Sequence, residues 1–239
     1  MTEEHQKQAP IVLAAGGTGG HVFPAESVAL ELKCRGWRLA LITDKRGIQY
    51  GNALTKLDQY IVNSGTPLLK GPLSKIISIF SLGIGIRQAS SILRQLNPAA
   101  VIGFGGYPSI PTMIAASRNG LATAIHEQNA VMGRANRFLA PKVLRIATSF
   151  ENTKGIRKKD LHKVNCTGNP TRLSIEDVSN TPYQQPGNND IIYLLVTGGS
   201  QGARVFSKLV PQAVGLLRSD IRQRIVISHH CRPEDKKVV

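Results

Sequence analysis

Residues 11–26 have the sequence IVLAAGGTGGHVFPAE, and this stretch decides the expected fold. The short apolar run Ile11–Ala15 predicts a buried strand. A glycine-rich run, Gly16–Gly20, follows it directly and leads into a helix that has Pro24 in its first turn. A strand, a glycine turn and a helix in this order are typical of a Rossmann-like unit. The turn and helix N-terminus of such a unit bind an anion such as a diphosphate.

Two common phosphate loops do not fit this stretch. A dinucleotide-binding frame that starts at Gly17 needs a glycine where Val22 stands, and the Gly-Lys-Ser or Gly-Lys-Thr ending of a P-loop is absent. A tight strand–helix turn without a ligand is the plain alternative, but four glycines within the five residues 16–20 favour a phosphate site.

Outward from this stretch, short apolar runs alternate with helical patterns. We expect strands at Ile11–Ala15, Leu39–Thr43, Ala100–Phe104, Ala122–His126 and Leu144–Thr148, and helices at Glu26–Arg35, Leu73–Leu96, Pro111–Asn119 and Met132–Ala140. Strands that alternate with helices form a parallel sheet with both faces covered, so the expected fold class is α/β.

A second unit begins after a stretch rich in Asn, Gln, Pro and Gly, Asn180–Asp190. A strand at Ile191–Thr197, a glycine turn, a helix at Ala203–Leu217 and a strand at Arg224–Ile227 are expected there. We therefore expect a first domain at 8–170, a linker at 171–190 and a second Rossmann-like domain at 191–239. Roughly 50 residues are too few to complete a doubly wound sheet, so the second domain is expected to be incomplete.

The composition is that of a globular protein with a strong basic excess. The 239 residues include 30 Lys or Arg and 15 Asp or Glu, which gives a formal net charge of +15. No acidic residue occurs from Gln59 to His126, so this part is expected to attract phosphates or anionic lipid. Aromatic residues make up 5% and show no stacking pattern, so nucleic acid is not an expected partner. Three widely spaced cysteines indicate a reducing compartment, and no membrane-spanning segment is expected.

The helix expected at Leu73–Leu96 is apolar on two sides. The stripe spaced to pack on a core consists of Leu73, Ile76, Ile77, Phe80 and Ile84. The residues off that stripe, which are expected to face outward, are Ile79, Leu82 and Ile86. With Lys70, Lys75 and Arg87 beside it, this second face suits docking on an anionic membrane surface. Burial of both sides within the fold is the alternative.

Polar or glycine-rich stretches follow three of the expected strands. They are the first glycine loop, Gly103–Tyr107, and His126–Asn129. In open α/β sheets, ligands bind outside the carboxyl ends of the strands, which is where all three stretches fall. The sequence therefore predicts one site at this edge.

The second unit has a glycine turn of its own, Gly198–Gly202. It is either another phosphate cradle, with the Ser200 hydroxyl as a donor, or the nucleophile elbow of a serine hydrolase. A hydrolase needs an acid and a histidine, and only Asp220 with His229 or His230 follow, so this reading is the weaker one. No Asp-x-Asp pair is present to hold a metal on a nucleotide diphosphate, and no metal site or cofactor is expected.

Five motifs together point to a family. They are Gly16–His21, Gly105–Tyr107, His126–Asn129, Gly168–Pro170 with Arg172, and Gly198–Ala203. In order and approximate spacing they resemble the MurG family of bacterial peptidoglycan glycosyltransferases, over about Ile11 to Ile227. The resemblance implies the GT-B fold, in which two Rossmann-like domains enclose a cleft.

The resemblance also implies an activity. Enzymes of this family are inverting, metal-independent hexosyltransferases that move GlcNAc from UDP-GlcNAc to the C4 hydroxyl of undecaprenyl-diphospho-MurNAc-pentapeptide, converting lipid I to lipid II. The step belongs to peptidoglycan synthesis, on which cell wall biogenesis, cell shape and cell division depend. The resemblance further implies a peripheral enzyme on the cytoplasmic face of the inner membrane.

The resemblance assigns site residues as well. Those that line the UDP-GlcNAc site are Thr18, Gly19, Gly20, Asn129, Arg172 and Ser200. Gly105, Gly106 and Tyr107 face the diphosphate of the acceptor. His21 lies at the mouth of the first glycine loop and suits a general base or a group that orients the acceptor; a helix-capping or cleft-lining histidine is the alternative.

Members of the family continue for a long stretch beyond the part matched here, so the donor site is expected to be incomplete. The chain is then either an active transferase or a membrane-docking, acceptor-binding half that is inactive alone. In the second case another chain supplies the missing residues of the second domain.

Overall fold

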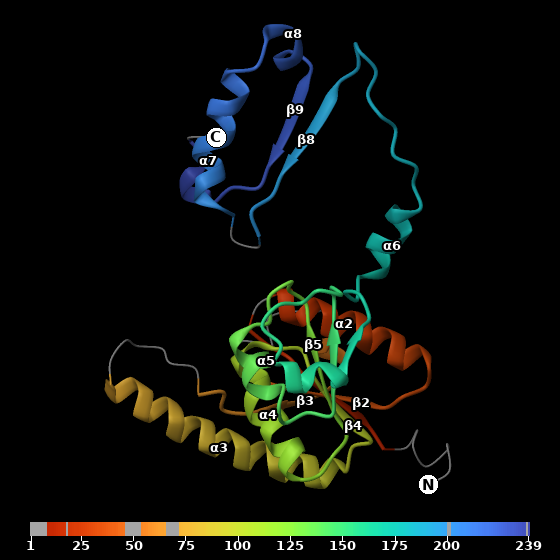
Figure 1. Cartoon of the computed structure of the whole chain (residues 1–239), viewed down its shortest axis with the longest axis vertical. Coiled ribbons are helices and arrows are strands. Elements are labelled where there is room, and N and C mark those ends of the chain that lie inside the picture. Colours follow the sequence, from red (N-terminus) through yellow and green to blue (C-terminus); the bar gives the residue numbers. More distant parts are fainter. Residues whose placement is uncertain (1–8, 18, 46–53, 66–71, 200–201, 238) are drawn as a thin grey trace. The chain divides into compact units, whose positions relative to one another are not determined.

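The computed structural model describes residues 9–17, 19–45, 54–65, 72–199, 202–237 and 239. The chain forms two compact units, Met1–Val178 (unit 1) and Ser179–Val239 (unit 2). Figure 1 shows the elements of both, and each unit is described by itself.

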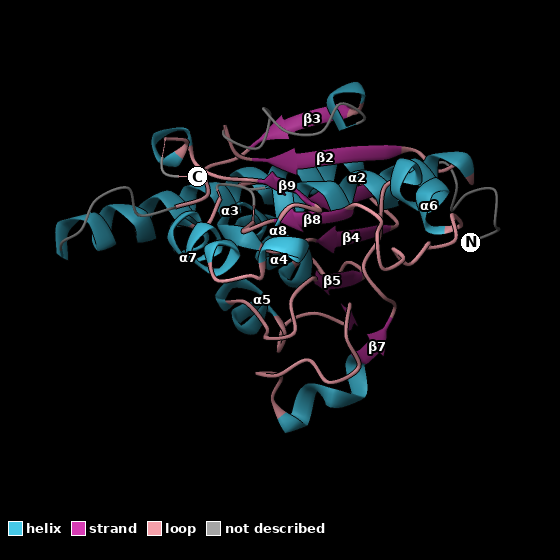
Figure 2. Ribbon diagram, turned by 90° about the horizontal axis from the view of Figure 1, so that it is seen from above, coloured by secondary structure: helices cyan, strands magenta, loops and turns pink. Residues whose placement is uncertain are grey.

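Unit 1 is built on a seven-stranded sheet with the order β3-β2-β1-β4-β5-β6-β7, in which every neighbouring pair is parallel. In Figure 2 the labelled strands of unit 1 follow in the order β3, β2, β4, β5 and β7. Their bounds are β1 (Ile11–Ala14), β2 (Leu39–Thr43), β3 (Asp58–Ile61), β4 (Ala100–Gly103), β5 (Thr123–Glu127), β6 (Arg145–Thr148) and β7 (Val164–Cys166). Ile11 pairs with both Leu39 and Ala100, so β1 lies between β2 and β4, where the direction of winding reverses. The α/β fold class is confirmed.

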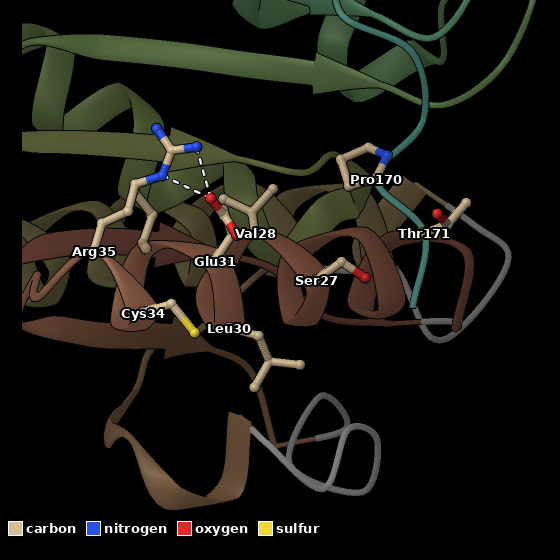
Figure 3. Close-up of a pocket in the computed structure, with 9 residues that line it drawn as sticks. Ser27, Val28, Leu30, Glu31, Cys34, Arg35, Pro170 and Thr171 are labelled. Carbon is tan, nitrogen blue, oxygen red and sulfur yellow. Dashed lines mark hydrogen bonds and ion pairs between the residues drawn. The ribbon is translucent and has the colours of Figure 1, made fainter. Parts of the chain in front are cut away.

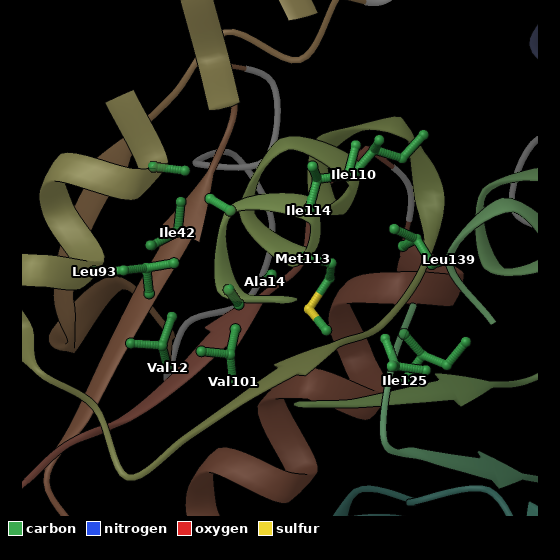
Figure 4. Close-up of a cluster of buried hydrophobic side chains, with 14 of the residues drawn as sticks. Val12, Ala14, Ile42, Leu93, Val101, Ile110, Met113, Ile114, Ile125 and Leu139 are labelled. Atoms are coloured by element: carbon green, nitrogen blue, oxygen red, sulfur yellow. The ribbon is translucent and has the colours of Figure 1, made fainter. Parts of the chain in front are cut away.

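Helices cover both faces of this sheet because successive strand residues point to opposite sides. Val12 and Ala14 pack with residues of α3 (Pro72–Leu96), α4 (Gly106–Arg118) and α5 (Arg134–Leu139), in the core cluster drawn in Figure 4. Leu13 and Ala15 pack instead with α2 (Gly19–Cys34) on the other face. Two short 3₁₀ helices, Leu54–Lys56 and Lys158–Lys163, complete the regular elements up to β7 in the described residues.

The two outermost strands, β3 and β7, were not expected from the sequence. β3 consists of Asp-Gln-Tyr-Ile with no buried residue, and β7 has only three residues. Edge strands have one free side and need no continuous apolar run, so the signal that identified the central strands is missing from them.

Two helices begin earlier than expected. α2 begins at Gly19 rather than Glu26, and α4 begins at Gly106 rather than Pro111. Glycines and prolines in these segments indicated loops. However, Pro108 lies in the first turn of α4, where its missing N–H breaks no helical hydrogen bond, and the buried Val22 and Ile110 pack the added turns on the core.

The assignment of the two apolar faces of α3 was wrong in part. Ile79, expected outside, is 70% exposed as predicted, and the side chains of Leu73 and Ile76 lie outside the description. Ile77 and Phe80, expected in the core, are 64% and 73% exposed. Leu82 and Ile86, expected outside, pack on the core in register with the buried Leu93. The spacing shows two faces but not which one meets the sheet, since that depends on the angle at which α3 lies on α4.

Two glycines of α3 differ sharply in their surroundings, which gives a matched stability prediction. A Cβ at Gly85 would lie 1.8 Å from the backbone oxygen of Asn63, whereas a Cβ at Gly83 would meet nothing within 4 Å. We expect Gly85→Ala to lower the free energy of unfolding by about 2–3 kcal/mol through overpacking, and Gly83→Ala to raise it by about 0.5–1 kcal/mol through helix propensity. Urea unfolding followed by the fluorescence of Trp37, the single tryptophan, measures both; equal effects would contradict the close approach of α3 to Asn63.

Unit 2 contains a parallel strand–helix–strand arrangement. Its elements are β8 (Ile192–Val196), α7 (Arg204–Gly215), α8 (Ser219–Arg222), β9 (Ile225–His229) and the 3₁₀ helix Pro233–Asp235. Ile192 pairs with Ile225 in parallel register. The segment expected as a linker, 171–190, includes a helix, α6 (Leu173–Ser179). In the part of the chain that the structure describes, no helix has the length and apolarity needed to cross a membrane.

Candidate functional site

The site predicted at the carboxyl edge of the sheet lies at the ends of the neighbouring strands β1 and β4. The glycine turn after β1 leads into α2, and the turn after β4 leads into α4. Gly105 and Gly106 have φ angles of +86° and +72°, which a side chain would strain, so glycine is required at both positions. The N-termini of α2 and α4 therefore meet at the reversal point of the sheet, which is where open α/β sheets bind ligands.

His21, in the first turn of α2, packs directly on the second glycine turn. A Cβ at Gly105 would lie 3.2 Å from His21 Nδ1, and one at Gly106 would lie 3.1 Å from His21 Cδ2. The Nδ1 atom is buried and has no hydrogen-bond partner among the described residues. The two glycine loops thus hold an imidazole between them, and its Nδ1 is free to accept a proton or a hydrogen bond.

Glu127, at the end of β5, organises the neighbouring loop. It is 1% exposed. Its Oε1 accepts hydrogen bonds from the backbone N–H and the Nδ2 of Asn129, at 3.0 and 2.9 Å. Its Oε2 accepts from the backbone N–H of Gly133 and from Nδ2 of Asn136, both at 2.9 Å. One buried carboxylate therefore fixes Asn129, the start of α5 and Asn136.

Asn136 connects this network to the second glycine turn. Its Nδ2 also donates to the backbone oxygen of His126, at 2.9 Å. A Cβ at Gly105 would lie 3.3 Å from the same Nδ2, so Asn136 and His21 both border Gly105. The buried Oδ1 of Asn136 has no partner among the residues that the structure describes, and the same holds for Oε1 of Gln128. Unpaired buried acceptors of this kind suit the hydroxyl or amide groups of a bound ligand.

His126 lies behind this edge and is 4% exposed. Its Nε2 lies 3.1 Å from the backbone oxygen of Gly168, which requires the proton to be on Nε2. Burial lowers the pKa of His126 below its usual value, although the contacts with Gly168 and Glu127 act in the opposite direction. The ring is therefore neutral in the folded chain near pH 7 and serves to tie β5 to the segment after β7.

The lowered pKa of His126 predicts a pH dependence of stability. As the pH falls below about 6.5, the unfolded chain binds a proton at this residue before the folded chain does, so the free energy of unfolding decreases. His126→Gln removes this titration, and we expect the variant to lose part of the decrease between pH 7.5 and pH 5.5. Urea titrations of Trp37 fluorescence measure the effect, with the exposed His162→Gln as control. An unchanged pH dependence in the His126 variant contradicts the prediction.

Arg172 is held against the first turns of α2. Its guanidinium carbon lies 4.5 Å from the centre of the Phe23 ring, and both side chains are exposed. A Cβ at Gly19 would lie 2.6 Å from the same ring, so glycine at this position leaves room for Phe23. Stacking on an aromatic face orients a guanidinium and leaves its N–H groups available for a phosphate.

Several predicted site residues therefore gather in unit 1. Those near the N-termini of α2 and α4 are Gly19, Gly20, His21, Gly105, Gly106, Tyr107 and Arg172. Asn129 is exposed, and its amide nitrogen is held by Glu127. Thr18 and Ser200 lie outside the described residues. Ser200 belongs to unit 2, and the same holds for Asp220, whose carboxylate pairs with Arg218.

Sequence reasoning missed the roles of Glu127 and Asn136. In the sequence Glu127 stands out only as a member of the polar stretch His126–Asn129, and no pattern marks Asn136 as a site residue. The one available signal was an asparagine, a poor helix former, inside the short helix Arg134–Leu139. Its partner Glu127 is nine positions away, and no periodicity connects the two.

A cavity of about 540 Å³ lies elsewhere, along the C-terminal half of α2 (Figure 3). Its lining includes Ser27, Cys34 and Pro170, and Arg35 and Glu31 form an ion pair of 2.6 Å beside it. None of the predicted site residues lines this cavity. The candidate site is therefore the edge at β1 and β4.

Comparisons with known proteins agree with this geometry. The chain is 52% identical over 225 residues to the UDP-N-acetylglucosamine–N-acetylmuramyl-(pentapeptide) pyrophosphoryl-undecaprenol N-acetylglucosamine transferase of Paramagnetospirillum magneticum, covering 94% of this chain and 61% of the relative. It is 48% identical over 227 residues to the protein of the same name from Rhodospirillum centenum, covering 95% and 60%. The crystal structure of Acinetobacter baumannii MurG is similar with a TM-score of 0.65 and 25% identity, over 95% of this chain and 67% of that one.

The chain thus spans about 60% of the length of the curated relatives that it matches. The sequence pattern of the glycosyltransferase family 28 N-terminal domain matches residues 11–148. This range contains six of the seven strands of unit 1, both glycine turns, His21 and Glu127. The resemblance drawn from five short motifs is confirmed, and the chain belongs to glycosyltransferase family 28.

Proposed function

We propose that this chain takes part in the inverting transfer of GlcNAc from UDP-GlcNAc to the C4 hydroxyl of undecaprenyl-diphospho-MurNAc-pentapeptide. The observation that carries the proposal is the position of His21, between two glycine turns at the reversal point of a family 28 domain. Two relatives, 52% and 48% identical, bear the name of this transferase.

In the proposed reaction, the acceptor C4 oxygen attacks the anomeric carbon of GlcNAc from the side opposite to the diphosphate. A new C–O bond forms as the bond to UDP breaks, and the configuration inverts. His21 takes the proton of the C4 hydroxyl, or orients that hydroxyl by accepting its hydrogen bond. Its Nδ1 has no hydrogen-bond partner among the described residues, which suits either role.

The departing UDP carries negative charge that must be stabilised, and we assign this to backbone N–H groups and a guanidinium. We assign the donor contacts to Thr18, Gly19, Gly20, Asn129, Arg172 and Ser200. The N-terminus of α2 and the guanidinium of Arg172, stacked on Phe23, supply positive potential on the same side of unit 1. Asn129 presents its Oδ1 while Glu127 holds its Nδ2.

The acceptor diphosphate is assigned to the second glycine turn. Gly105 and Gly106 lead into α4 beside His21, and Tyr107 is 44% exposed next to them. The N-terminus of a helix is a suitable site for a phosphate.

Attachment to an anionic membrane surface is assigned to the exposed face of α3. Ile77 and Phe80 are exposed, and Arg87 lies further along the same helix. In Figures 1 and 2, the N-terminal turns of α3 extend beyond the rest of unit 1. Apolar residues flanked by bases bind peripherally to anionic lipid, so we propose that the chain attaches to the cytoplasmic face of the inner membrane. The proposed transfer reaction belongs to peptidoglycan synthesis, on which cell shape and cell division depend.

A transfer assay with labelled UDP-GlcNAc and a soluble lipid I analogue tests the proposal. It is run with the chain alone and with the portion of the Paramagnetospirillum magneticum relative that this chain does not match. Transfer by the chain alone supports a complete enzyme. Transfer only with the added portion supports a partner-dependent acceptor half, which is then expected to bind anionic liposomes but not UDP-GlcNAc when alone. No transfer in either condition overturns the proposal.

Membership of a glycosyltransferase family favours this function over a serine hydrolase. An activated phosphonate is therefore expected to leave Ser200 unlabelled. Covalent labelling of Ser200 would support the hydrolase instead.

A further inference from the structure

An apolar pocket of about 420 Å³ lies between α3, α4 and α5 in unit 1. Its walls include Ile79 and Leu82 of α3, Tyr107 and Ile110 of α4, and Phe138 of α5. The volume falls within the range of about 300–1,000 Å³ that is usual for small-molecule sites. Among the described residues that line the pocket there is no carboxylate, and Arg134 is the one charged group.

The pocket adjoins the second glycine turn. Tyr107 lines it and directly follows Gly106, the glycine that packs on His21. Arg134 lies in the first turn of α5, whose preceding residue, Gly133, is fixed by Glu127. A ligand with its diphosphate at Gly105–Gly106 would therefore have an apolar cavity beside it, which begins at Tyr107 and includes the cation of Arg134 in its lining.

The opposite wall of the pocket reaches the surface of α3. Ile79 lines the pocket and is also 70% exposed, next to Phe80, which is 73% exposed and lies outside the pocket. Three regions thus follow one another on unit 1: a backbone turn suited to phosphate, an apolar cavity, and an apolar helix face.

We propose that this pocket binds the isoprene units of the acceptor nearest to its diphosphate. The inference rests on the proposed function and adds a subsite to it. A polyprenyl diphosphate has its phosphates, its first isoprene units and the rest of its chain in the same order as these three regions. A nucleotide or a sugar would leave its polar groups unpaired against Ile79, Leu82 and Phe138, which is unfavourable in an apolar site.

Direct binding of short prenyl diphosphates tests this subsite without any transfer reaction. Isothermal titration calorimetry of the full chain is performed with inorganic diphosphate, neryl diphosphate and all-cis farnesyl diphosphate, each below its micelle concentration. We expect affinity to rise with each isoprene unit, to about tenfold or more for the farnesyl compound over inorganic diphosphate, with an increasingly negative heat-capacity change. Equal affinities for the three ligands overturn the inference.

Variants on adjacent positions of α3 locate the binding. Ser78→Phe fills the pocket, and we expect it to bring the affinity for farnesyl diphosphate to within about threefold of that for inorganic diphosphate. Ile79→Ser removes part of the wall at an exposed position, so folding is retained and prenyl affinity falls. Phe80→Ser, which is exposed but outside the pocket, is the matched control and keeps the wild-type preference.

An equal loss in Phe80→Ser and Ser78→Phe would indicate adsorption to the face of α3 and overturn the assignment to the pocket. Failure of the proposed function remains distinguishable. A chain that transfers GlcNAc but shows no prenyl-length dependence contradicts only the pocket, whereas a chain that binds prenyl diphosphates and transfers nothing contradicts only the transferase.

Discussion

Glu127→Ala is expected to lower the free energy of unfolding of unit 1 by about 3 kcal/mol or more. The substitution leaves four N–H groups without their acceptor, and those of Asn136 and Gly133 belong to the packed start of α5. A buried donor that loses its partner costs about 1–3 kcal/mol, and the gain from removing a buried charge offsets only part of that sum. Urea unfolding followed by Trp37 fluorescence provides the measurement.

The matched control for this prediction is Glu31→Ala. Glu31 has the same side chain, but it pairs with Arg35 on the surface of α2, with 60% of its side chain exposed. Exposed ion pairs contribute about 0–1 kcal/mol, so little change is expected. If both alanine variants lose the same small amount, the network around Glu127 does not stabilise the fold as its geometry indicates.

A second substitution, Glu127→Gln, separates stability from donor binding. It keeps the shape of the side chain, but the amide NH₂ group that replaces one carboxylate oxygen cannot accept hydrogen bonds from the neighbouring N–H groups. We expect this variant to remain folded at 25 °C and to bind UDP-GlcNAc about tenfold more weakly or worse, because Asn129 loses its fixed orientation. The affinities of wild type and variant for UDP-GlcNAc are compared with the chain alone or with the added portion of the relative, whichever gives donor binding. An unchanged affinity contradicts the positioning of Asn129 by Glu127.

His21→Ala is expected to lower transfer of GlcNAc by about 10²–10⁴-fold, the usual contribution of a general base. Stability is expected to change little, because His21 is only half-buried and its Nδ1 makes no hydrogen bond within the described residues. The assay uses the condition, chain alone or chain with the added portion of the relative, in which the wild type transfers. His162→Ala, at an exposed position of the 3₁₀ helix Lys158–Lys163, is the control and retains wild-type turnover.

The kinetics of the His21 variant decide between its two proposed roles. Loss of a base mainly lowers kcat, whereas loss of an orienting contact mainly raises the KM for the acceptor. Turnover within about threefold of the wild type would leave His21 with neither role, and the proposed reaction would need another base.

Local pattern was enough to predict the centre of the fold. The apolar runs at 11–15, 39–43 and 100–104 are the buried strands β1, β2 and β4, each placed within one or two residues. Buried parallel strands need continuous apolar residues, and glycine turns need positive φ angles, so both leave marks at fixed positions in the chain. The edge strands β3 and β7 carry no such mark, because half of their surface faces away from the core.

The site divides in the same way. Glycine runs and polar strand ends predicted which edge of the sheet binds ligands, and five short motifs were enough to identify the family. The contacts of Glu127 with Asn136, the packing of His21 on Gly106 and the outward face of α3 were not predictable from pattern. The two contacts join residues whose separation is unrelated to any helical or strand period. The outward face of α3 depends on how this helix packs on its neighbours.

By itself, the sequence therefore determined the strand–turn–helix order, the glycine positions and the family, since these depend on the preferences of neighbouring residues. Only the tertiary structure decided which apolar stripe of α3 is exposed, which carboxylate holds Asn129, and where an apolar pocket opens beside Tyr107. These features depend on how helices of fixed sequence pack against one another, and packing is set by the shapes of side chains that meet only after the chain has folded.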